Sequence, residues 1–162
     1  MPKRPDPVSP ADDQAIALAR SLLDIGHASL AYIDAVTQTP GISRIAFGLA
    51  PDGMPMTLIS ALAPHFDGLK AQPACALMFG EPGEKGDPLT HPRLMLRAKA
   101  RFVLPNDAAR PDLRAHWLEI HPKAKLYIDF SDFALVLLEP EAALLNAGFG
   151  RAFGLTPEQL LK

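Results

Sequence analysis

The sequence predicts a mainly β domain, a closed or partly closed antiparallel β-barrel of six or seven strands with about three flanking helices. Hairpin-type turn signals, rather than strand–helix–strand crossovers, separate the early apolar runs, which argues against a doubly wound parallel sheet. Residues 93–103 alternate strictly between apolar and polar side chains, as a strand with one buried face does. A length of 162 residues suits one domain around one hydrophobic core.

The first structured element is expected to be a helix that begins at Ser9-Pro10. Serine is a favourable N-cap, and proline suits the first helical position. The preceding residues 1–9 contain charges and three prolines. We therefore expect a flexible tail over residues 1–9 and a single domain over residues 10–162.

An antiparallel meander follows this helix. Residues 30–33 form the first expected strand. Residues 42–49 and 56–60 form a hairpin around Pro51-Asp52-Gly53, because Asp-Gly suits the positive φ angles of tight turns.

A short helix over residues 64–72 and a strand over residues 74–80 are expected next. The strand is apolar at nearly every position, which is typical of a central strand. Residues 81–92 carry three prolines and two glycines and predict a long loop, of the kind often used as a lid or an interface.

The alternating strand 93–103 places four cations on one face. Such a face usually meets water, but four like charges also repel one another. Acidic residues of a neighbouring strand or subunit, or an anionic ligand, would relieve that repulsion. These cations are Arg93, Arg97, Lys99 and Arg101.

The last third predicts a helix over residues 112–120 and final strands over residues 133–138 and 142–145. Gly148-Phe149-Gly150 follows them. Two glycines around an aromatic residue allow a bend at a barrel rim, or a close approach of backbone to a flat ligand or a neighbouring subunit.

Composition excludes several classes of function. The net charge of −2 gives no global field for nucleic acid or an anionic membrane, and no apolar run is long enough to span a bilayer. The single cysteine, Cys75, lies in an apolar run and predicts a buried, inert thiol in a reducing cytoplasm. No common catalytic or metal-binding motif occurs, so no catalytic residue and no metal ligand is assigned.

The turn over residues 59–66 is a candidate phosphate site, because a strand ends there and a helix begins. Helix N-terminal amides bind anions, and Ser60 and His65 would add hydrogen-bond donors. The alternative is that these residues only cap the helix.

Several segments, in this order and spacing, resemble the FMN-binding split-barrel family related to pyridoxamine 5'-phosphate oxidase, and most of all its haem-utilisation, haem-degrading branch. The resemblance covers roughly residues 15–152. It is carried by Leu58-Ile59-Ser60-Ala61-Leu62-Ala63 with His65, Leu69 to Leu77, Gly86-Asp87-Pro88-Leu89, His121-Pro122-Lys123-Ala124 with Tyr127, Phe130 and Asp132-Phe133, and Gly148-Phe149-Gly150-Arg151-Ala152.

This resemblance implies a homodimer that binds a small molecule at the subunit interface. The cofactor would be FMN, with haem as the alternative. Ser60 and His65 would lie beside the flavin phosphate, and Arg93, Phe149 and Arg151 near the flavin or the interface.

One run departs from the family pattern. Where relatives carry Thr-Arg-Asn after the histidine, this chain has Phe66-Asp67-Gly68, and Asp67 would repel a phosphate dianion. We expect weakened FMN affinity unless Arg44 or Lys70 compensates. Two functions therefore stay open: a flavin-dependent oxidoreductase, and a non-catalytic haem- or flavin-binding protein of the haem-utilisation type with a degenerate cofactor site.

Overall fold

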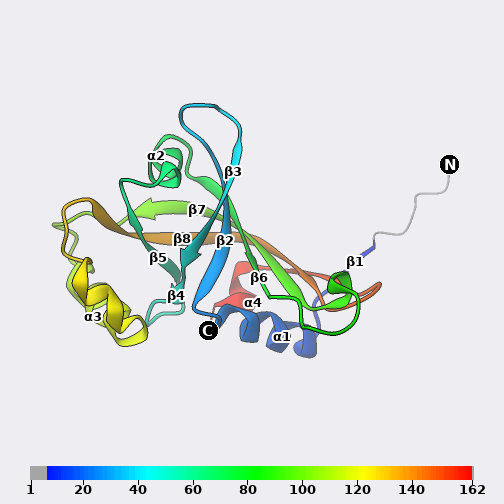
Figure 1. Ribbon diagram of the computed structural model, residues 1–162. Helices are drawn as coiled ribbons and strands as arrows, with labels where there is room; N and C mark the ends of the chain where they lie inside the picture. The colour runs from blue at the N-terminus through cyan, green and yellow to red at the C-terminus, as the bar shows by residue number, and fades with distance from the viewer. Residues whose placement is uncertain (1–6, 162) are drawn as a thin grey trace.

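The computed structural model describes residues 7–161, and within them a single mixed β-sheet curls into a split barrel with helices packed around it (Figure 1). The predicted mainly β, antiparallel fold is confirmed, with more strands than expected. The strands are β1 (Val8–Pro10), β2 (His27–Ile33), β3 (Pro40–Ala46), β4 (Gly48–Leu49), β5 (Pro55–Ser60), β6 (Ala74–Phe79), β7 (Arg93–Phe102), β8 (Phe133–Asn146) and β9 (Ala152–Leu155). The helices are α1 (Asp13–Leu23), α2 (Pro64–Ala71), α3 (Arg110–Ile120) and α4 (Pro157–Leu160), with 3₁₀ turns at Pro88–Thr90 and Pro122–Leu126.

The strands follow the spatial order β1-β9-β8-β7-β6-β2-β3, and β5 pairs with β4 and with β8. The ladder is broken between β3 and β5, where the Thr57 hydroxyl donates a hydrogen bond to the Ala46 carbonyl (2.6 Å) in place of strand pairing. This opening makes the barrel a split one. Of the hairpin expected between 42–49 and 56–60, only the end beside the Asp-Gly turn is present, as the short antiparallel pair β4–β5. Most of the predicted strand 42–49 belongs to β3, which pairs with β2 instead.

Strand β8 joins the two parts of the sheet. It pairs with β7 along most of its length, while its other edge pairs first with β5 and then with β9. A bulge leaves Glu141 without a partner opposite β7. The bulge reverses which positions face the main core: Val136 and Leu138 before it, Ala143 and Leu145 after it. The two strands predicted over 133–138 and 142–145 are therefore one bent strand.

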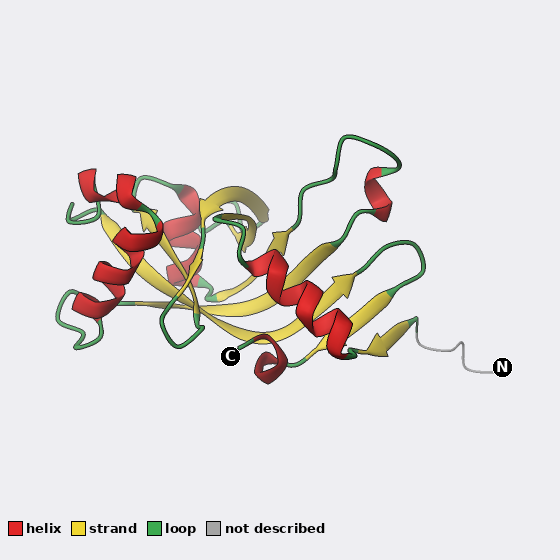
Figure 2. Cartoon of the chain, turned by 90° about the horizontal axis from the view of Figure 1, so that it is seen from below, coloured by secondary structure: helices red, strands yellow, loops and turns green. Residues whose placement is uncertain are grey.

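The hydrophobic interior has two parts. Helix α1 lies across one face of the sheet (Figure 2) and buries Ala15, Ala19 and Leu23 in the main core. A smaller cluster forms under α3 around Trp117, which is 1% exposed. No helix of the described residues has both the length and the apolar character needed to cross a membrane.

The N-terminal expectations need two corrections. Helix α1 begins at Asp13 rather than at Ser9-Pro10, because the Asp12 carboxylate caps it by accepting a hydrogen bond from the Ala15 amide (2.8 Å). Val8 and Ser9 are not part of a tail, because β1 pairs in parallel with β9. The rest of the predicted tail, residues 1–6, lies outside the described residues.

The alternation of β7 is confirmed, with Leu94, Leu96 and Ala98 buried. Two cations on its exposed face pair with acidic residues of β8, which is the neighbouring-strand alternative given in the sequence analysis. Lys99 Nζ lies 2.8 Å from Glu141, and Arg101 Nε donates to Glu139 (2.7 Å). These pairs relieve the repulsion but, being exposed, contribute little to stability.

Candidate functional site

The turn that links β5 to α2 satisfies most of its own polar groups. Ser60 Oγ donates to the Asp132 carboxylate (3.0 Å) and accepts from the Leu62 amide (3.1 Å). The Ala61, Ala63 and Phe66 amides donate to backbone carbonyls of Asp132, Ser60 and Ala63. Because these donors already have acceptors and a carboxylate adjoins Ser60, the turn is a poor receptor for a phosphate.

His65 is held inside the barrel end rather than at a ligand-binding surface. Its side chain is buried, with Nδ1 3.1 Å from the Ser43 hydroxyl and its ring edge-on to Tyr32. Burial lowers the pKa of His65, which favours the neutral imidazole. His65 is therefore a packed, hydrogen-bonded residue with no positive charge to offer a phosphate at neutral pH.

The run Phe66-Asp67-Gly68 has a structural role. Phe66 packs edge-to-face on Phe102, with 5.1 Å between ring centroids. A Cβ at position 68 would lie 2.6 Å from the Ile33 carbonyl oxygen, so only glycine lets α2 approach β2 this closely. Asp67 is exposed to solvent. Docking of α2 on the sheet thus explains two of the three departures from the family pattern.

Among residues 7–161, neither Arg44 nor Lys70, the proposed compensating cations, forms a hydrogen bond with Ser60 or His65. Strand β3, which carries Arg44, pairs with β2 and not with β5, so the pairing assumed in the sequence prediction is wrong. Arg44 is exposed and stands opposite Ser29 of β2. Lys70 Nζ lies over the Phe66 ring, 4.7 Å from its centroid.

The remaining predicted residues gather at the far end of β7 and β8, beside the 81–92 loop (Figure 1). Arg93 Nη1 donates to the Leu89 carbonyl (2.9 Å). Phe149 is 93% exposed at the tip of the β8–β9 turn, where Gly148 and Gly150 adopt positive φ. Arg151 lies over the Phe153 ring at 5.8 Å. Within one chain, Ser60 and His65 are therefore separate from Arg93, Phe149 and Arg151, because they stand at opposite ends of β8.

A hollow that sequence reasoning missed lies on the solvent-exposed face of β2, β3, β6 and β7. We call it the outer-face hollow. It has a volume of about 260 Å³ and an almost wholly apolar surface, with Ile42 78% and Met78 49% exposed. Its lining is Ser29, Ala31, Ile42, Ala76, Leu77, Met78 and Met95.

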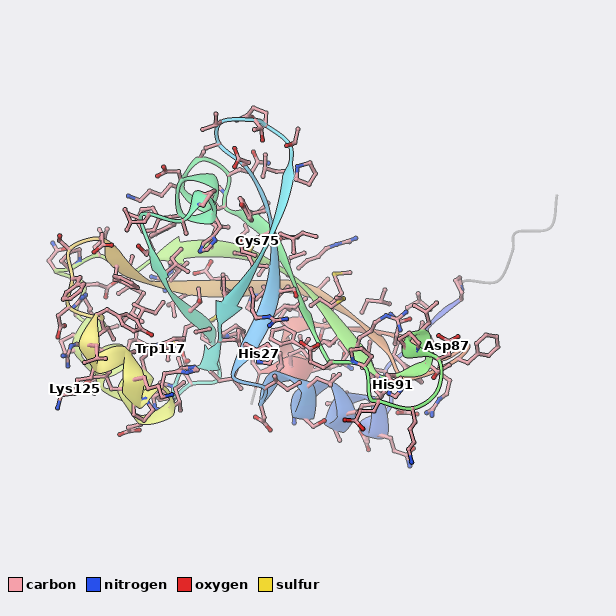
Figure 3. All side chains as sticks on the ribbon, in the orientation of Figure 1. His27, Cys75, Asp87, His91, Trp117 and Lys125 are labelled. Atoms are coloured by element: carbon pink, nitrogen blue, oxygen red, sulfur yellow. The ribbon has the colours of Figure 1, made fainter. Side chains whose placement is uncertain are left out.

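Charged and titratable groups border the outer-face hollow. Arg44 stands opposite Ser29, and Arg97 stands opposite Ala76, so one cation lies at each side. His27 lies on the same face of β2 as Ser29, near the start of that strand (Figure 3). The His27 Nε2 is 3.2 Å from Glu81. The only signal in the sequence is that these residues alternate with buried ones, and strand register is needed to bring them together.

Cys75 matches its sequence prediction of an inert thiol. It is half-buried on β6, and burial raises the pKa of its thiol to about 11, with the Glu141 charge as a smaller cause. No three His, Cys, Asp or Glu side chains within residues 7–161 are grouped as metal ligands.

Comparison with known proteins places this fold in a family. No protein-family profile matches the chain. One solved protein structure aligns over 95% of this chain and 99% of its own, with 42% identity and a TM-score of 0.82. A heme binding protein from Mycobacterium smegmatis aligns over 94% of this chain, with 28% identity and a TM-score of 0.78. A pyridoxinephosphate oxidase family protein from Clostridium acetobutylicum, related to general stress protein 26, shares the fold at 14% identity over 93% of this chain and 99% of its own, with a TM-score of 0.66.

The chain belongs to the split-barrel family related to pyridoxamine 5'-phosphate oxidase. Its similarity extends to haem-related members of this split-barrel family. One curated relative is the chloroplastic non-canonical heme oxygenase HOZ of Arabidopsis thaliana, 33% identical over 114 residues, or 70% of this chain. The chain spans about a third (34%) of that protein and 61% of the Mycobacterium protein.

Membership of the split-barrel family raises the question of which cofactor the residues fit. Most donors of the β5–α2 turn already have acceptors, and the Asp132 carboxylate adjoins Ser60, so the turn fits an FMN phosphate poorly. The outer-face hollow combines an apolar floor with flanking arginines, which fits an apolar ring system that carries carboxylates. One chain supplies too small a volume for a whole porphyrin, and a facing surface is needed to enclose it.

Proposed function

We propose that this protein binds haem, and that two copies of the chain hold it between their outer sheet faces. The outer-face hollow is the observation that carries the proposal. Ile42, Met78 and Met95 give it an apolar floor that is partly exposed to solvent and able to contact an apolar ligand or a second copy. The haem-binding Mycobacterium relative and the plant haem oxygenase support the same ligand class.

The charges around the hollow suit the propionates of haem. Arg44 and Arg97 are exposed, and among residues 7–161 neither forms an ion pair within 4 Å. Arginine binds carboxylates in a two-point geometry, so each side of the hollow offers a propionate site. In this proposal the apolar floor contacts the porphyrin face and the arginines fix its orientation.

His27 is our candidate for the iron ligand. By its strand position it lies on the face of the hollow, two residues before Ser29, a separation of roughly 7 Å along β2. Its Nε2 faces Glu81, and a carboxylate partner on one ring nitrogen leaves the other nitrogen as the metal-binding atom. Imidazole is a common axial ligand of haem iron.

Haemin titration followed by visible spectroscopy tests the proposal. We expect a Soret band that saturates at one haem per two chains, about tenfold weaker binding for Arg44→Gln or Arg97→Gln, and a shifted Soret maximum for His27→Ala. Lys125→Gln on the 3₁₀ turn after α3 is the matched control and should bind as the wild type does. A protein that shows no Soret band with haemin contradicts the proposal.

The dimer has its own test. Met78→Glu places a charge in the middle of the apolar face and should convert a dimer into a monomer in analytical ultracentrifugation, with circular dichroism as the folding control. A wild-type protein that sediments as a monomer with and without haemin would remove the second copy from the proposal.

A flavin-dependent oxidoreductase is the second candidate. The fold shared with the pyridoxinephosphate oxidase family protein favours it, as does Arg44, which would meet a phosphate at the edge of the hollow. Titration with FMN in place of haemin separates the two, and in this case Arg44→Ala should weaken FMN binding. A cytoplasmic location is also proposed, supported by the single reduced cysteine.

A further inference from the structure

A second hollow, separate from the outer-face hollow, lies between α2, the end of β7, the start of α3 and the start of β8. Its volume is about 180 Å³, and it shares no lining residue with the outer-face hollow. Phe66, Phe102 and Phe133 supply aromatic walls, while Lys70, Arg110 and Ser131 supply polar groups. We call it the Lys70–Arg110 hollow.

The two cations give this hollow a positive potential. Within residues 7–161 neither Lys70 nor Arg110 lies within 4 Å of a carboxylate oxygen. The charge of Arg110 contributes to the lowered pKa of Asp129. The Asp129 carboxylate, however, accepts hydrogen bonds from Nε and Nη2 of Arg114 and not from Arg110. Two positively charged side chains thus face one small space without a dedicated acid.

Helix α3 adds to this potential. Arg110 is its first residue, and the N-cap residue Ala109 has no side chain able to accept a hydrogen bond from the first turn. A cation at a helix N-terminus is unfavourable, because both carry positive charge. Asp112 offsets this only in part. The arrangement is costly for the empty chain and favourable once an anion is bound.

The aromatic walls restrict the kind of anion. Lys70 Nζ lies 4.7 Å from the Phe66 centroid and 5.6 Å from the Phe102 centroid, so the ammonium sits at the rim of a π surface. A volume of about 180 Å³ is comparable with that of an engineered apolar cavity of about 150 Å³ that holds benzene. One aromatic ring therefore fits within the hollow, whereas a fused ring system would extend beyond it.

We propose that the Lys70–Arg110 hollow binds a small aromatic carboxylate of one ring. The ring packs among Phe66, Phe102 and Phe133, and the carboxylate accepts hydrogen bonds from Lys70 and Arg110. This site does not depend on haem binding, because it shares no lining residue with the outer-face hollow, and the two hollows use opposite ends of β7.

Calorimetric titration with benzoate tests the site. For nine heavy atoms we expect a dissociation constant on the order of 1 mM, weakened by added salt. Arg110→Gln and Lys70→Gln should each weaken benzoate binding about tenfold, and Lys125→Gln should leave it unchanged. Cyclohexanecarboxylate, which has the charge without the π face, should bind more weakly than benzoate.

Three results would overturn the proposal: no benzoate binding by the wild type, equal affinity in Arg110→Gln, or equal weakening in Lys125→Gln. Amide NMR shifts of Ser131 and Ala134 locate the ligand, and both should move on titration. If Lys70→Gln does not fold, Arg110→Gln alone decides, because its side chain lies outside the hydrophobic core. Haemin titration of Arg110→Gln should match the wild type, which separates this test from that of haem binding.

Discussion

Replacing Gly68 by alanine tests whether packing, rather than a ligand, explains the unusual run in α2. Alanine is favoured over glycine inside a helix by about 1 kcal/mol, so propensity alone predicts a more stable protein. The structure predicts the opposite. The new Cβ would lie 2.6 Å from the Ile33 carbonyl oxygen and 2.8 Å from a Tyr32 ring carbon, and backbone is a neighbour that yields little.

The magnitude follows from the two opposed effects. Overpacking of this kind costs about 2–3 kcal/mol, and the helix preference returns about 1 kcal/mol, so we expect a net loss of about 1–2 kcal/mol. For a chain of this length that lowers the Tm by roughly 2–8 °C. Thermal and urea unfolding followed by circular dichroism measure it.

Gly26→Ala is the matched control for this experiment. Its Cβ would meet only His121 Cε1 at 3.5 Å, an ordinary contact, and its φ is not in the left-handed region. We expect it to be neutral or to stabilise by about 0.5 kcal/mol. If Gly68→Ala is as stable as Gly26→Ala, the close approach of α2 to β2 is not what requires glycine, and the structural explanation of Phe66-Asp67-Gly68 fails.

Three further predictions concern single groups. Cys75, with its thiol pKa raised to about 11, should react with iodoacetamide at pH 8 on the order of a hundredfold more slowly than a free thiol, and a rate equal to that of glutathione would refute its burial. The Arg114 guanidinium lowers the pKa of Asp129, so this ion pair stabilises the fold above the pKa of the unfolded carboxyl group, and the stabilisation is lost as pH falls through the pKa of the folded one. Acid unfolding of Arg114→Gln should therefore depend less on pH in this window, and a profile identical to that of the wild type would contradict the assignment. Asp12→Ala removes the N-cap of α1 and should cost about 1 kcal/mol in urea unfolding, whereas an unchanged midpoint would show that the cap contributes nothing.

Much of the fold could be predicted because the patterns that indicate its elements depend on residues that are close together in the sequence. The alternation of β7 and the Asp-Gly turn of β4–β5 each depend on a few neighbouring side chains, and both are present. Strand β1 was missed because its partner β9 lies more than 140 residues away, and proline-rich local sequence gave no sign of that pairing. The sequence predicts the start of α1 too early, because Ser9-Pro10 has the residue types of a helix N-cap and first turn. The residue that caps the helix is Asp12, three residues after Ser9.

The candidate site was less accessible to sequence reasoning than the fold. Ser60 and His65 flank one turn, as the sequence predicts. Their hydrogen-bond partners, Asp132 and Ser43, come from segments that are distant in the sequence. The outer-face hollow draws its lining from four strands, and no strand contributes more than three of its residues. Strand register decides which of these side chains come together, and register cannot be predicted from the sequence of a single strand.

Glu141, the bulge residue that has no partner opposite β7, affects how strand β8 tolerates a change in its length. Removing Glu141 would place Ala142 directly after Pro140, so the ladder to β7 would become regular while Ala143 and Leu145 keep their inward positions. The strand would lose the bend of the bulge and the Glu141–Lys99 ion pair, but it would keep its pattern of buried side chains. Related chains are therefore expected to differ in whether a residue stands at this position, because the interior of the barrel is the same with it and without it.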